Sequence, residues 1–142
     1  MPSLTKKRCT TLFASQPVAV LATVGPEGPH VVPIVFAVKQ DRIVSAVDHK
    51  PKRTADLRRL ANIKHCPQVS LLVQAYDDDW SKLWWVRADG DAVVVERGDD
   101  WETATAALQA RYEQYRDRRP EGPAIVVSVT GWTGWEYRSR SS

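Results

Sequence analysis

Short runs of aliphatic and β-branched residues recur along the chain, and glycine, proline or charged residues bound each run. Runs of this length and composition are typical of β-strands. The predicted strands span residues 18–24, 29–38, 42–47, 69–73, 83–96 and 124–129, and the last continues past Gly131. Because short polar turns join most of these runs, we expect antiparallel pairing.

Three features modify this regular pattern. Residues 18–24 are apolar at nearly every position, which is typical of a buried strand. Pro33 cannot donate to a strand ladder, so it predicts a bulge or an unpaired position. Asp89-Gly90 interrupts the run 83–96, which we interpret as one long strand, or two halves, bent at this dipeptide.

Helical spacing of apolar residues appears between and before the strands. The predicted helices span residues 3–14, 50–60 and 101–116. Six or more strands with two to three helices describe a mainly β domain, either an antiparallel barrel or a sandwich with helical covers. We expect a single domain over residues 1–142.

The run Lys50-Pro51-Lys52-Arg53-Thr54 begins the second predicted helix, directly after the strand 42–47. A helix start favours negative charge, because the N–H groups of its first turn have no partner within the helix. Cations at this end therefore suggest that an external anion compensates them. Lys50, Lys52, Arg53 and Thr54 together supply the donors that a phosphate requires. A solvated basic helix start is the alternative, and the run alone does not decide between the two.

The composition is that of an ordinary soluble domain. Of the 142 residues, 43% are hydrophobic and 26% are charged, and the net charge is +3. Acidic and basic residues are interleaved without a recognition signature, so nucleic acid is not an expected partner. The apolar run 31–38 is too short to span a bilayer, and the N-terminus lacks the apolar stretch of a signal peptide. We expect a cytoplasmic protein in which Cys9 and Cys66 are reduced thiols.

Side chains suited to direct catalysis are sparse. The histidines are His30, His49 and His65, and none belongs to a Ser/His/Asp or Cys/His grouping with a usual spacing. His49, His65 and Cys66 also lack the spacing of a closed metal site. We therefore assign no catalytic residue and no metal site, and we leave His30 open between a groove position and a structural one.

Tryptophan is concentrated in one segment. Trp80, Trp84 and Trp85 are three of the six tryptophans in the chain. Such rings either fill a barrel end or a subunit interface, or form a wall against a flat ring system. Neighbouring strand residues point to opposite faces, so Trp84 and Trp85 cannot line one pocket together. One is expected in the core or an interface, and the other in a pocket or at the surface.

Several short motifs occur in an order that resembles a known family. They are Leu21-Ala22-Thr23, Gly28-Pro29-His30-Val31-Val32-Pro33, Lys50-Pro51-Lys52-Arg53-Thr54, Leu57-Arg58-Arg59-Leu60, Val69-Ser70-Leu71-Leu72, Asp79-Trp80 and Trp84-Trp85-Val86-Arg87-Ala88-Asp89-Gly90. Across residues 10–135 the chain resembles the split β-barrel superfamily of pyridoxamine 5′-phosphate oxidases. It is most similar to the branch that uses the deazaflavin coenzyme F420.

The resemblance implies a split β-barrel that forms a homodimer, with a cofactor groove at the interface. The residues implied to bind the cofactor's phosphate are Lys50, Lys52, Arg53 and Thr54. Those implied to border its ring are Val32, Pro33, Ile34, Ser45, Ala46 and Val47. The residues implied to close the site from the second subunit are Trp80, Leu83, Trp84 and Trp85. Arg87 either stabilises its strand or approaches the cofactor.

The function implied is that of an F420-dependent oxidoreductase, which transfers a hydride between the reduced deazaflavin and an unsaturated organic acceptor. Because such a cofactor carries the reactive chemistry, the protein mainly binds and orients it. An anion site without a catalytic constellation agrees with this role. The alternatives are an FMN-binding oxidoreductase of the same fold and a non-catalytic cofactor-binding or carrier protein.

Overall fold

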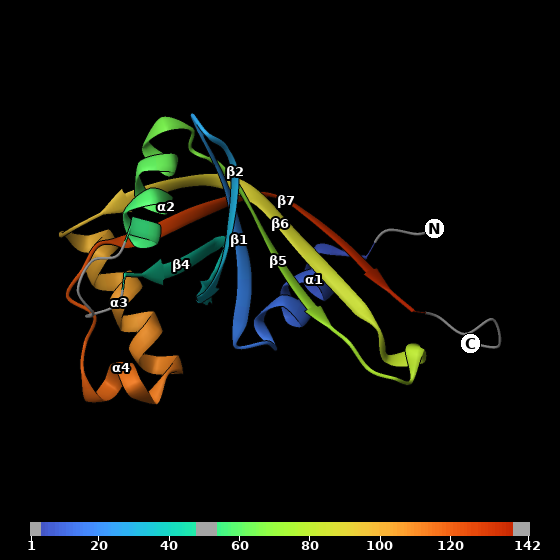
Figure 1. The fold of residues 1–142 in the computed structure, drawn as a ribbon. Coiled ribbons are helices and arrows are strands. Elements are labelled where there is room, and N and C mark those ends of the chain that lie inside the picture. The colour runs from blue at the N-terminus through green and yellow to red at the C-terminus, as the bar shows by residue number, and fades with distance from the viewer. Residues whose placement is uncertain (1–3, 48–53, 138–142) are drawn as a thin grey trace.

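The computed structural model describes residues 4–47 and 54–137. Seven strands form one antiparallel sheet that curls into an open barrel with helices around it (Figure 1). The strands are β1 (Val18–Gly25), β2 (Gly28–Val35), β3 (Ala37–Lys39), β4 (Arg42–Ala46), β5 (Gln68–Ala75), β6 (Trp84–Val95) and β7 (Ala124–Glu136). The helices of the described part are α1 (Lys6–Ala14), α2 (Thr54–His65), α3 (Asp99–Arg111) and α4 (Glu113–Asp117), with a short 3-10 helix, η1 (Trp80–Lys82).

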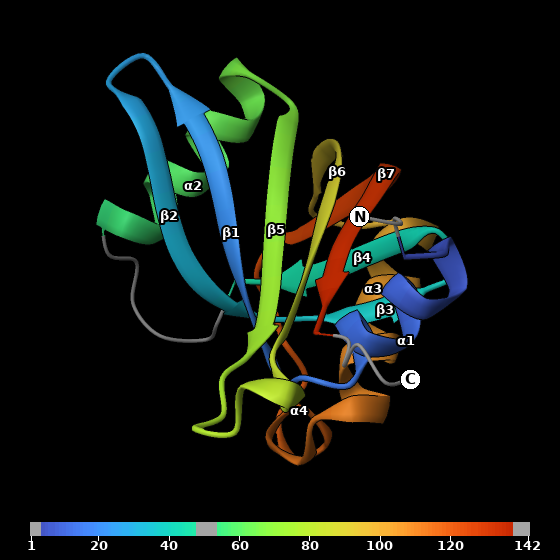
Figure 2. The same ribbon diagram turned by 90° about the vertical axis from the view of Figure 1, so that its right-hand side faces the viewer.

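The strand order brings the two edges of the sheet together. The order is β2-β1-β5-β6-β7-β4-β3, so β2 and β3 are the edge strands, although only Phe36 separates them in the chain. The sheet must therefore curl until its edges meet (Figure 2). Across this join, the Ser45 hydroxyl of β4 donates to the Val35 carbonyl at 2.8 Å. The expected antiparallel split barrel is confirmed.

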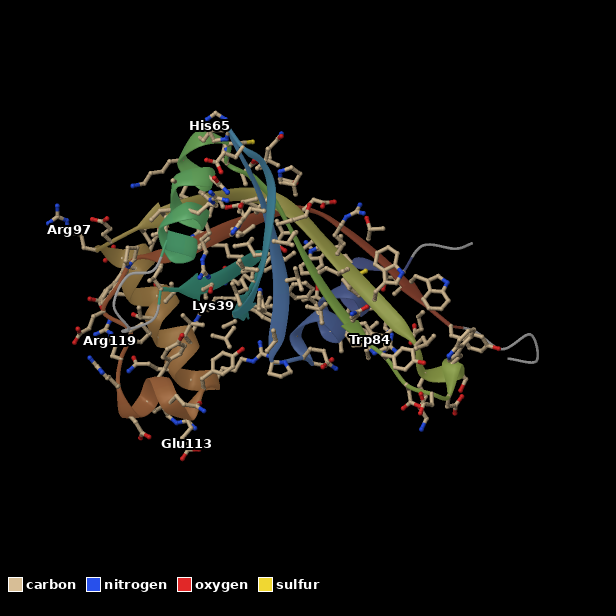
Figure 3. The ribbon with its side chains drawn as sticks, in the orientation of Figure 1. Lys39, His65, Trp84, Arg97, Glu113 and Arg119 are labelled. Atoms are coloured by element: carbon tan, nitrogen blue, oxygen red, sulfur yellow. The ribbon has the colours of Figure 1, made fainter. Side chains whose placement is uncertain are left out.

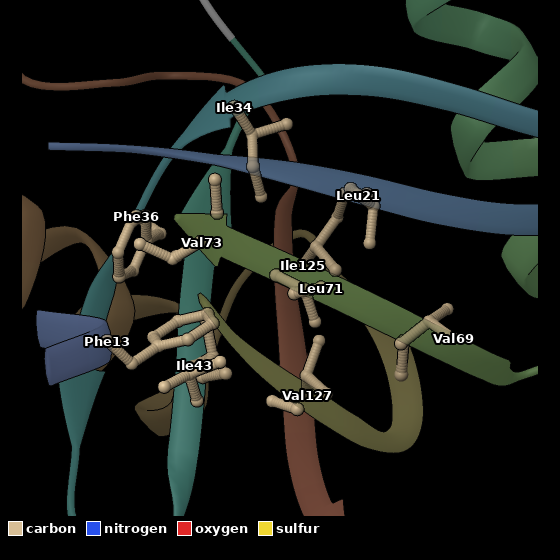
Figure 4. Packing of buried hydrophobic residues seen from close by; sticks show 14 of the residues in the cluster. Phe13, Leu21, Ile34, Phe36, Ile43, Val69, Leu71, Val73, Ile125 and Val127 are labelled. Carbon is tan, nitrogen blue, oxygen red and sulfur yellow. The ribbon is translucent and has the colours of Figure 1, made fainter. Parts of the chain in front are cut away.

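The inner face of the sheet forms the main hydrophobic core. Buried and exposed residues alternate along β1 and β5, as the two-residue period of a strand requires. Leu21, Leu71 and Ile125 point inward and pack with Phe13 of α1 and Phe36 (Figure 4). This packing fixes α1 against the barrel.

A second, smaller core lies where α3 and α4 cover the sheet. Leu108 of α3 and Tyr115 of α4 pack with Val44 of β4 and Val126 of β7. Residues 43–46 and 124–127 are consequently buried along their whole length. Burial on both faces explains why these segments are unbroken apolar runs.

The strand 18–24 was expected to be buried, but its outward side is open. Val18, Val20 and Val24 are 48%, 39% and 47% exposed, because no helix of the described chain covers this face of β1. The sequence pattern resembles that of a buried strand because both faces of β1 are apolar.

The single helix predicted over 101–116 is wrong, because the chain divides at Tyr112 into α3 and α4. Tyr112 has an extended backbone, with φ −113° and ψ 123°. Its hydroxyl lies 2.7 Å from the Pro17 carbonyl oxygen and accepts a hydrogen bond from the Phe36 N–H at 3.1 Å. Arg111 donates to the Phe36 carbonyl at 2.8 Å and to the last carbonyl of α1 at 3.1 Å. These hydrogen bonds satisfy backbone groups where the two sheet edges meet. Together they outweigh the preference of residues 101–116 for one continuous helix.

Two predictions concerning β2 and β6 have different outcomes. The predicted strand 29–38 is divided at Phe36, and Pro33 pairs in register with Val20 without a bulge. An edge strand tolerates proline because its free side needs no donor. The predicted bend at Asp89-Gly90 is confirmed as a register shift between β6 and β7.

Two helix boundaries also differ from the predicted ones. α1 begins at Lys6 rather than at residue 3, because the Thr5 side chain accepts a hydrogen bond from the Arg8 N–H at 3.1 Å and caps the helix there. α2 continues to His65, beyond the predicted end at residue 60. The predicted start of this helix at residue 50 lies outside the described residues.

Gly90 lies at the bend of β6, where its backbone is packed against β7. A Cβ atom at this position would lie 2.3 Å from the Ser128 carbonyl oxygen. We predict that Gly90→Ala lowers the free energy of unfolding by about 1–3 kcal/mol, the usual cost of overpacking. Gly131, beside the same register shift, faces open space, so Gly131→Ala is the matched control. Urea denaturation compares the two variants, and equal stabilities would contradict this packing.

Candidate functional site

The outer face of β1, β2, β5 and β6 carries an apolar groove. Val20, Val31 and Leu72 point outward from this face, and Val31 is 64% exposed. With Trp85 and Arg87 they line a cavity of about 480 Å³. Cavities of this size are typical of binding sites, and an outer sheet face that meets only water is usually polar. The groove is therefore a candidate binding surface.

The groove continues into a polar section along β5 and β6. Ser70 belongs to both sections, and the polar one is a cavity of about 440 Å³ that also contains Asp89 and Thr130. The Ser70 hydroxyl donates to the Asp89 carboxylate at 2.6 Å, and Arg87 Nε donates to the same carboxylate at 3.1 Å. Arg87 is thus held on the outer face, where its charge lies beside the apolar section.

The expectation that Trp84 and Trp85 face opposite sides is confirmed. Trp84 packs against the main core from the start of β6 (Figure 3). Trp85 lines the outer groove. Trp84 therefore belongs to the core, and Trp85 is the ring available to a ligand or a partner.

Trp80 lies in η1, at the tip of an arm formed by the ends of β5, β6 and β7 (Figure 1). It is 64% exposed. Asp79 caps this short helix by accepting hydrogen bonds from the Ser81 hydroxyl at 2.7 Å and the Ser81 N–H at 3.1 Å. These hydrogen bonds hold the pKa of Asp79 below its ordinary value. Leu83, half-buried, ends η1 and leads into β6.

The six residues expected to border a cofactor ring come from β2 and from β4 and its end. Ser45 joins the two segments through its bond to the Val35 carbonyl. Ile34, Ser45 and Ala46 are buried. Val32 and Val47 are half-buried, and Pro33 is exposed. Val32 packs against the main core, whereas Pro33 lies on the opposite face of β2, so the structure does not bring these two side chains to one surface.

The cationic part of the expected phosphate site falls on Lys50, Lys52 and Arg53, which lie outside the described residues. Thr54 is the first residue of α2. The Val47 N–H, at the other end of this interval, donates to the Pro123 carbonyl at 2.9 Å. Val47 and Thr54 thus bracket the basic run between β4 and α2.

The residues implied for one cofactor site are far apart within a single chain. In Figure 1, η1 lies at the opposite end of the molecule from α2. Trp80 therefore cannot approach the start of α2 in its own chain.

The described residues hold neither a metal cluster nor a disulfide. Within 4–47 and 54–137, no three His, Cys, Asp or Glu side chains are grouped to hold a metal ion. In the same ranges, no helix combines the length and the apolar character that a membrane crossing requires. Cys9 and Cys66 are free thiols, and burial raises the pKa of the Cys9 thiol.

The Ser70–Asp89–Arg87 cluster was missed by sequence reasoning. A weak signal exists, because Arg87 and Asp89 alternate along β6 and so share one face. Ser70 joins them only through the pairing of β5 with β6, which sets Ser70 opposite Asp89. That register does not follow from spacing in the sequence.

The chain matches the family model described as pyridoxamine 5′-phosphate oxidase over residues 5–136. This match spans nearly the whole chain, and the protein belongs to this family. The expected superfamily is confirmed, whereas its deazaflavin branch stays a prediction. No curated protein matches the chain.

Solved structures share the fold at low sequence identity. A FAD-binding protein from Mesorhizobium loti is 16% identical, with a TM-score of 0.73 and coverage of 94% of this chain and 95% of that one. A FAD-binding protein from Mycobacterium smegmatis is 18% identical, with a TM-score of 0.66 and coverage of 97% and 100%. A heme-binding protein from Mycobacterium smegmatis is 23% identical, with a TM-score of 0.73 and coverage of 93% and 54%. At these identities the likeness shows the fold.

The Ser45 hydroxyl supports the join beside the candidate ring site. We predict that Ser45→Ala lowers the free energy of unfolding by about 0.5–1.5 kcal/mol, because the mutation removes a hydrogen bond to the Val35 carbonyl. Ser128 is exposed on the neighbouring β7, so Ser128→Ala is the matched control. Chemical denaturation followed by circular dichroism measures both variants. An unchanged Ser45→Ala protein would show that this bond does not support the join.

Proposed function

We propose that the protein is an F420-dependent oxidoreductase that acts as a homodimer. The observation that carries the proposal is the basic run 50–54, whose side chains supply the donors that a phosphate requires. In the chain, this run stands between the end of β4 and the first turn of α2, in a fold of the pyridoxamine 5′-phosphate oxidase family.

The residues at this junction fit a cofactor with a phosphate and a flat ring. Lys50, Lys52, Arg53 and Thr54 supply charged and hydroxyl donors of the kind that binds phosphate. Of the residues expected at the ring, Pro33 is exposed on the outer face of β2, and Val47 is half-buried where β4 meets the run.

When bound, the deazaflavin would supply a hydride to an unsaturated organic acceptor. The chain's own part is to bind the phosphate, hold the ring against β2 and β4, and exclude water from the reacting face. Fixing the distance and orientation of two reactants is itself a large part of catalysis. It needs no side-chain nucleophile, which agrees with the sparse catalytic groups in the sequence.

The outer groove and the arm support the proposed dimer. Val18, Val20, Val24, Val31 and Leu72 are large apolar side chains exposed on one sheet face. A continuous apolar surface of this kind marks an interaction site. A second copy would cover this face and bring its own Trp80–Lys82 segment toward the start of α2, which a single chain cannot do.

Two alternative functions have specific support. The FAD-binding proteins of the same fold favour a flavin, and hence an FMN-binding oxidoreductase. The heme-binding protein of the same fold favours a non-catalytic cofactor carrier. The three functions require different cofactors, so identifying the cofactor that the protein binds distinguishes among them.

We predict that protein expressed in a host lacking F420 purifies colourless and then binds oxidised F420 with micromolar or tighter affinity, which corresponds to about 8 kcal/mol. Lys52→Ala and Arg53→Ala should each raise the Kd by roughly ten- to a hundredfold, because each removes a charge-assisted hydrogen bond. Quenching of tryptophan fluorescence on titration measures the binding.

Lys64→Ala is the matched control, since Lys64 is exposed in the last turn of the same helix, α2. It should leave the Kd unchanged. A yellow protein with stoichiometric FMN and no F420 binding would replace the proposal with the flavin alternative. Tight binding of haem alone would replace it with the carrier.

We predict a homodimer that a charge in the outer groove dissociates. Leu72→Glu should shift the sedimenting species from twice the chain mass toward the 16.0 kDa monomer, because the mutation would bury an unpaired carboxylate in the interface. Val93→Glu is the control, since Val93 is 53% exposed but lies outside the groove. Wild-type protein that sediments as a monomer at micromolar concentration would refute the dimer.

A further inference from the structure

Arg87 stands at the end of a row of side chains that crosses the outer groove. Pro33 of β2 lies opposite Val20 of β1, and Val20 lies opposite Leu72 of β5. Leu72 in turn lies opposite Arg87 of β6. Residues opposite each other in antiparallel strands share one face, and all four are exposed. The row therefore leads from Pro33, an expected ring residue, over two apolar side chains to a guanidinium.

The row is long enough to hold a small molecule. Neighbouring strands lie about 4.8 Å apart, so three strand spacings place the backbone of Pro33 about 14 Å from that of Arg87. The cavity over Val20, Leu72 and Arg87 has a volume of about 480 Å³, and Trp85 also lines it. A cavity of this volume is the usual size of a small-molecule site.

Arg87 has donors left for a ligand. Its Nε atom donates to both oxygens of Asp89, at 3.1 and 3.3 Å, and among the described residues neither Nη atom has a partner. The Ser70 hydroxyl donates to the same carboxylate at 2.6 Å and so helps to hold it in place. Arg87 is 45% exposed and lines the cavity, so its guanidinium is accessible. The two Nη atoms form a planar fork that matches the two oxygens of a carboxylate.

An exposed ion pair is by itself an ordinary surface feature. What distinguishes Arg87 is its place at the end of an apolar row, on the face that the proposed dimer covers. Covering this face would remove water from the Nη atoms, and donors left there without a partner are costly. A ligand that combines an apolar body with one anionic group would satisfy both parts of the groove.

We propose that the hydride acceptor is a flat, apolar, unsaturated carboxylic acid. Its carboxylate binds the two Nη atoms of Arg87, and its body lies over Leu72 and Val20 toward Pro33. A carboxylate fits better than a phosphate, because Asp89 already offsets much of the positive charge of Arg87. This substrate class rests on the proposed function, since Pro33 is one of the residues expected at the coenzyme ring.

The double bond that is reduced then lies at the end of the acid remote from Arg87, beside the expected ring. The reaction is one two-electron transfer. A hydride from the reduced coenzyme adds to one carbon of the double bond and a proton from water adds to the other, with oxidation of the coenzyme. Arg87 takes no part in this transfer and acts only by positioning the acid.

Binding of 2-naphthoate to the protein without coenzyme tests the acid site, with 2-naphthamide as the neutral molecule of the same shape. Calorimetry gives both affinities. We expect 2-naphthoate to bind about tenfold more tightly than the amide, and acetate, which lacks the apolar body, to bind roughly tenfold more weakly than 2-naphthoate. Arg87→Gln should remove the preference for the acid but leave binding of the amide unchanged, which also shows that the variant is folded.

Arg97→Gln is the control, because Arg97 is exposed at the turn between β6 and α3, outside the groove (Figure 3). It should leave both affinities unchanged. Equal binding of acid and amide by the wild-type protein, or a preference that survives Arg87→Gln, would overturn the proposed acid site.

Two further measurements on Arg87→Gln separate the acid site from other roles of this residue. The Kd for F420 should equal that of the wild type, and a weakened F420 complex would assign Arg87 to the coenzyme instead. Sedimentation should still give the dimer, and a monomer would show that Arg87 pairs with the second copy. If F420 does not bind but the preference for 2-naphthoate stands, the proposed function fails while the acid site remains.

Discussion

Phe36 carries the chain from one edge of the seven-stranded sheet to the other, and the closure of the barrel depends on this step. Its ring is fully buried and packs edge-on against Phe13, with the ring centroids 4.9 Å apart. The Arg111 guanidinium lies 4.6 Å from the centroid of the same ring. Tyr112 binds the Phe36 backbone, so α1, α3 and both sheet edges meet at one residue. Buried packing and satisfied backbone groups at this residue hold the barrel closed.

Closure at Phe36 also determines which surfaces remain for function. It sets the end of β2 beside β4 through the Ser45–Val35 hydrogen bond, although the residues expected at a cofactor ring alternate between the two faces of β2. The main core occupies the inner face of the sheet, and α3 and α4 cover β4 and β7. What remains is the outer face of β1, β2, β5 and β6, where apolar side chains and the Arg87–Asp89 pair are accessible. The proposed dimer uses this remaining face.

Local patterns predicted much of the fold. Strand positions, the bend at Asp89-Gly90 and the opposite orientations of Trp84 and Trp85 follow from short-range rules of composition and strand geometry. The divisions at Phe36 and Tyr112 do not, because they depend on contacts between residues 76 positions apart. A cavity lined by His30 could not be predicted from local patterns either, because its lining residues Glu27 and Arg58 are 31 positions apart. The sequence indicated the chemistry of the run 50–54, whereas the separation of Trp80 from α2 required the structure.

In the proposed dimer, one cofactor site is built from two copies of the chain. A crystal structure of the protein with oxidised F420 tests this arrangement. We expect the coenzyme between two copies, with its phosphate on Lys52 and Arg53 of one chain and its ring near the Trp80–Lys82 segment of the other. A coenzyme held entirely within one chain, or bound away from the run 50–54, would rule out the shared site.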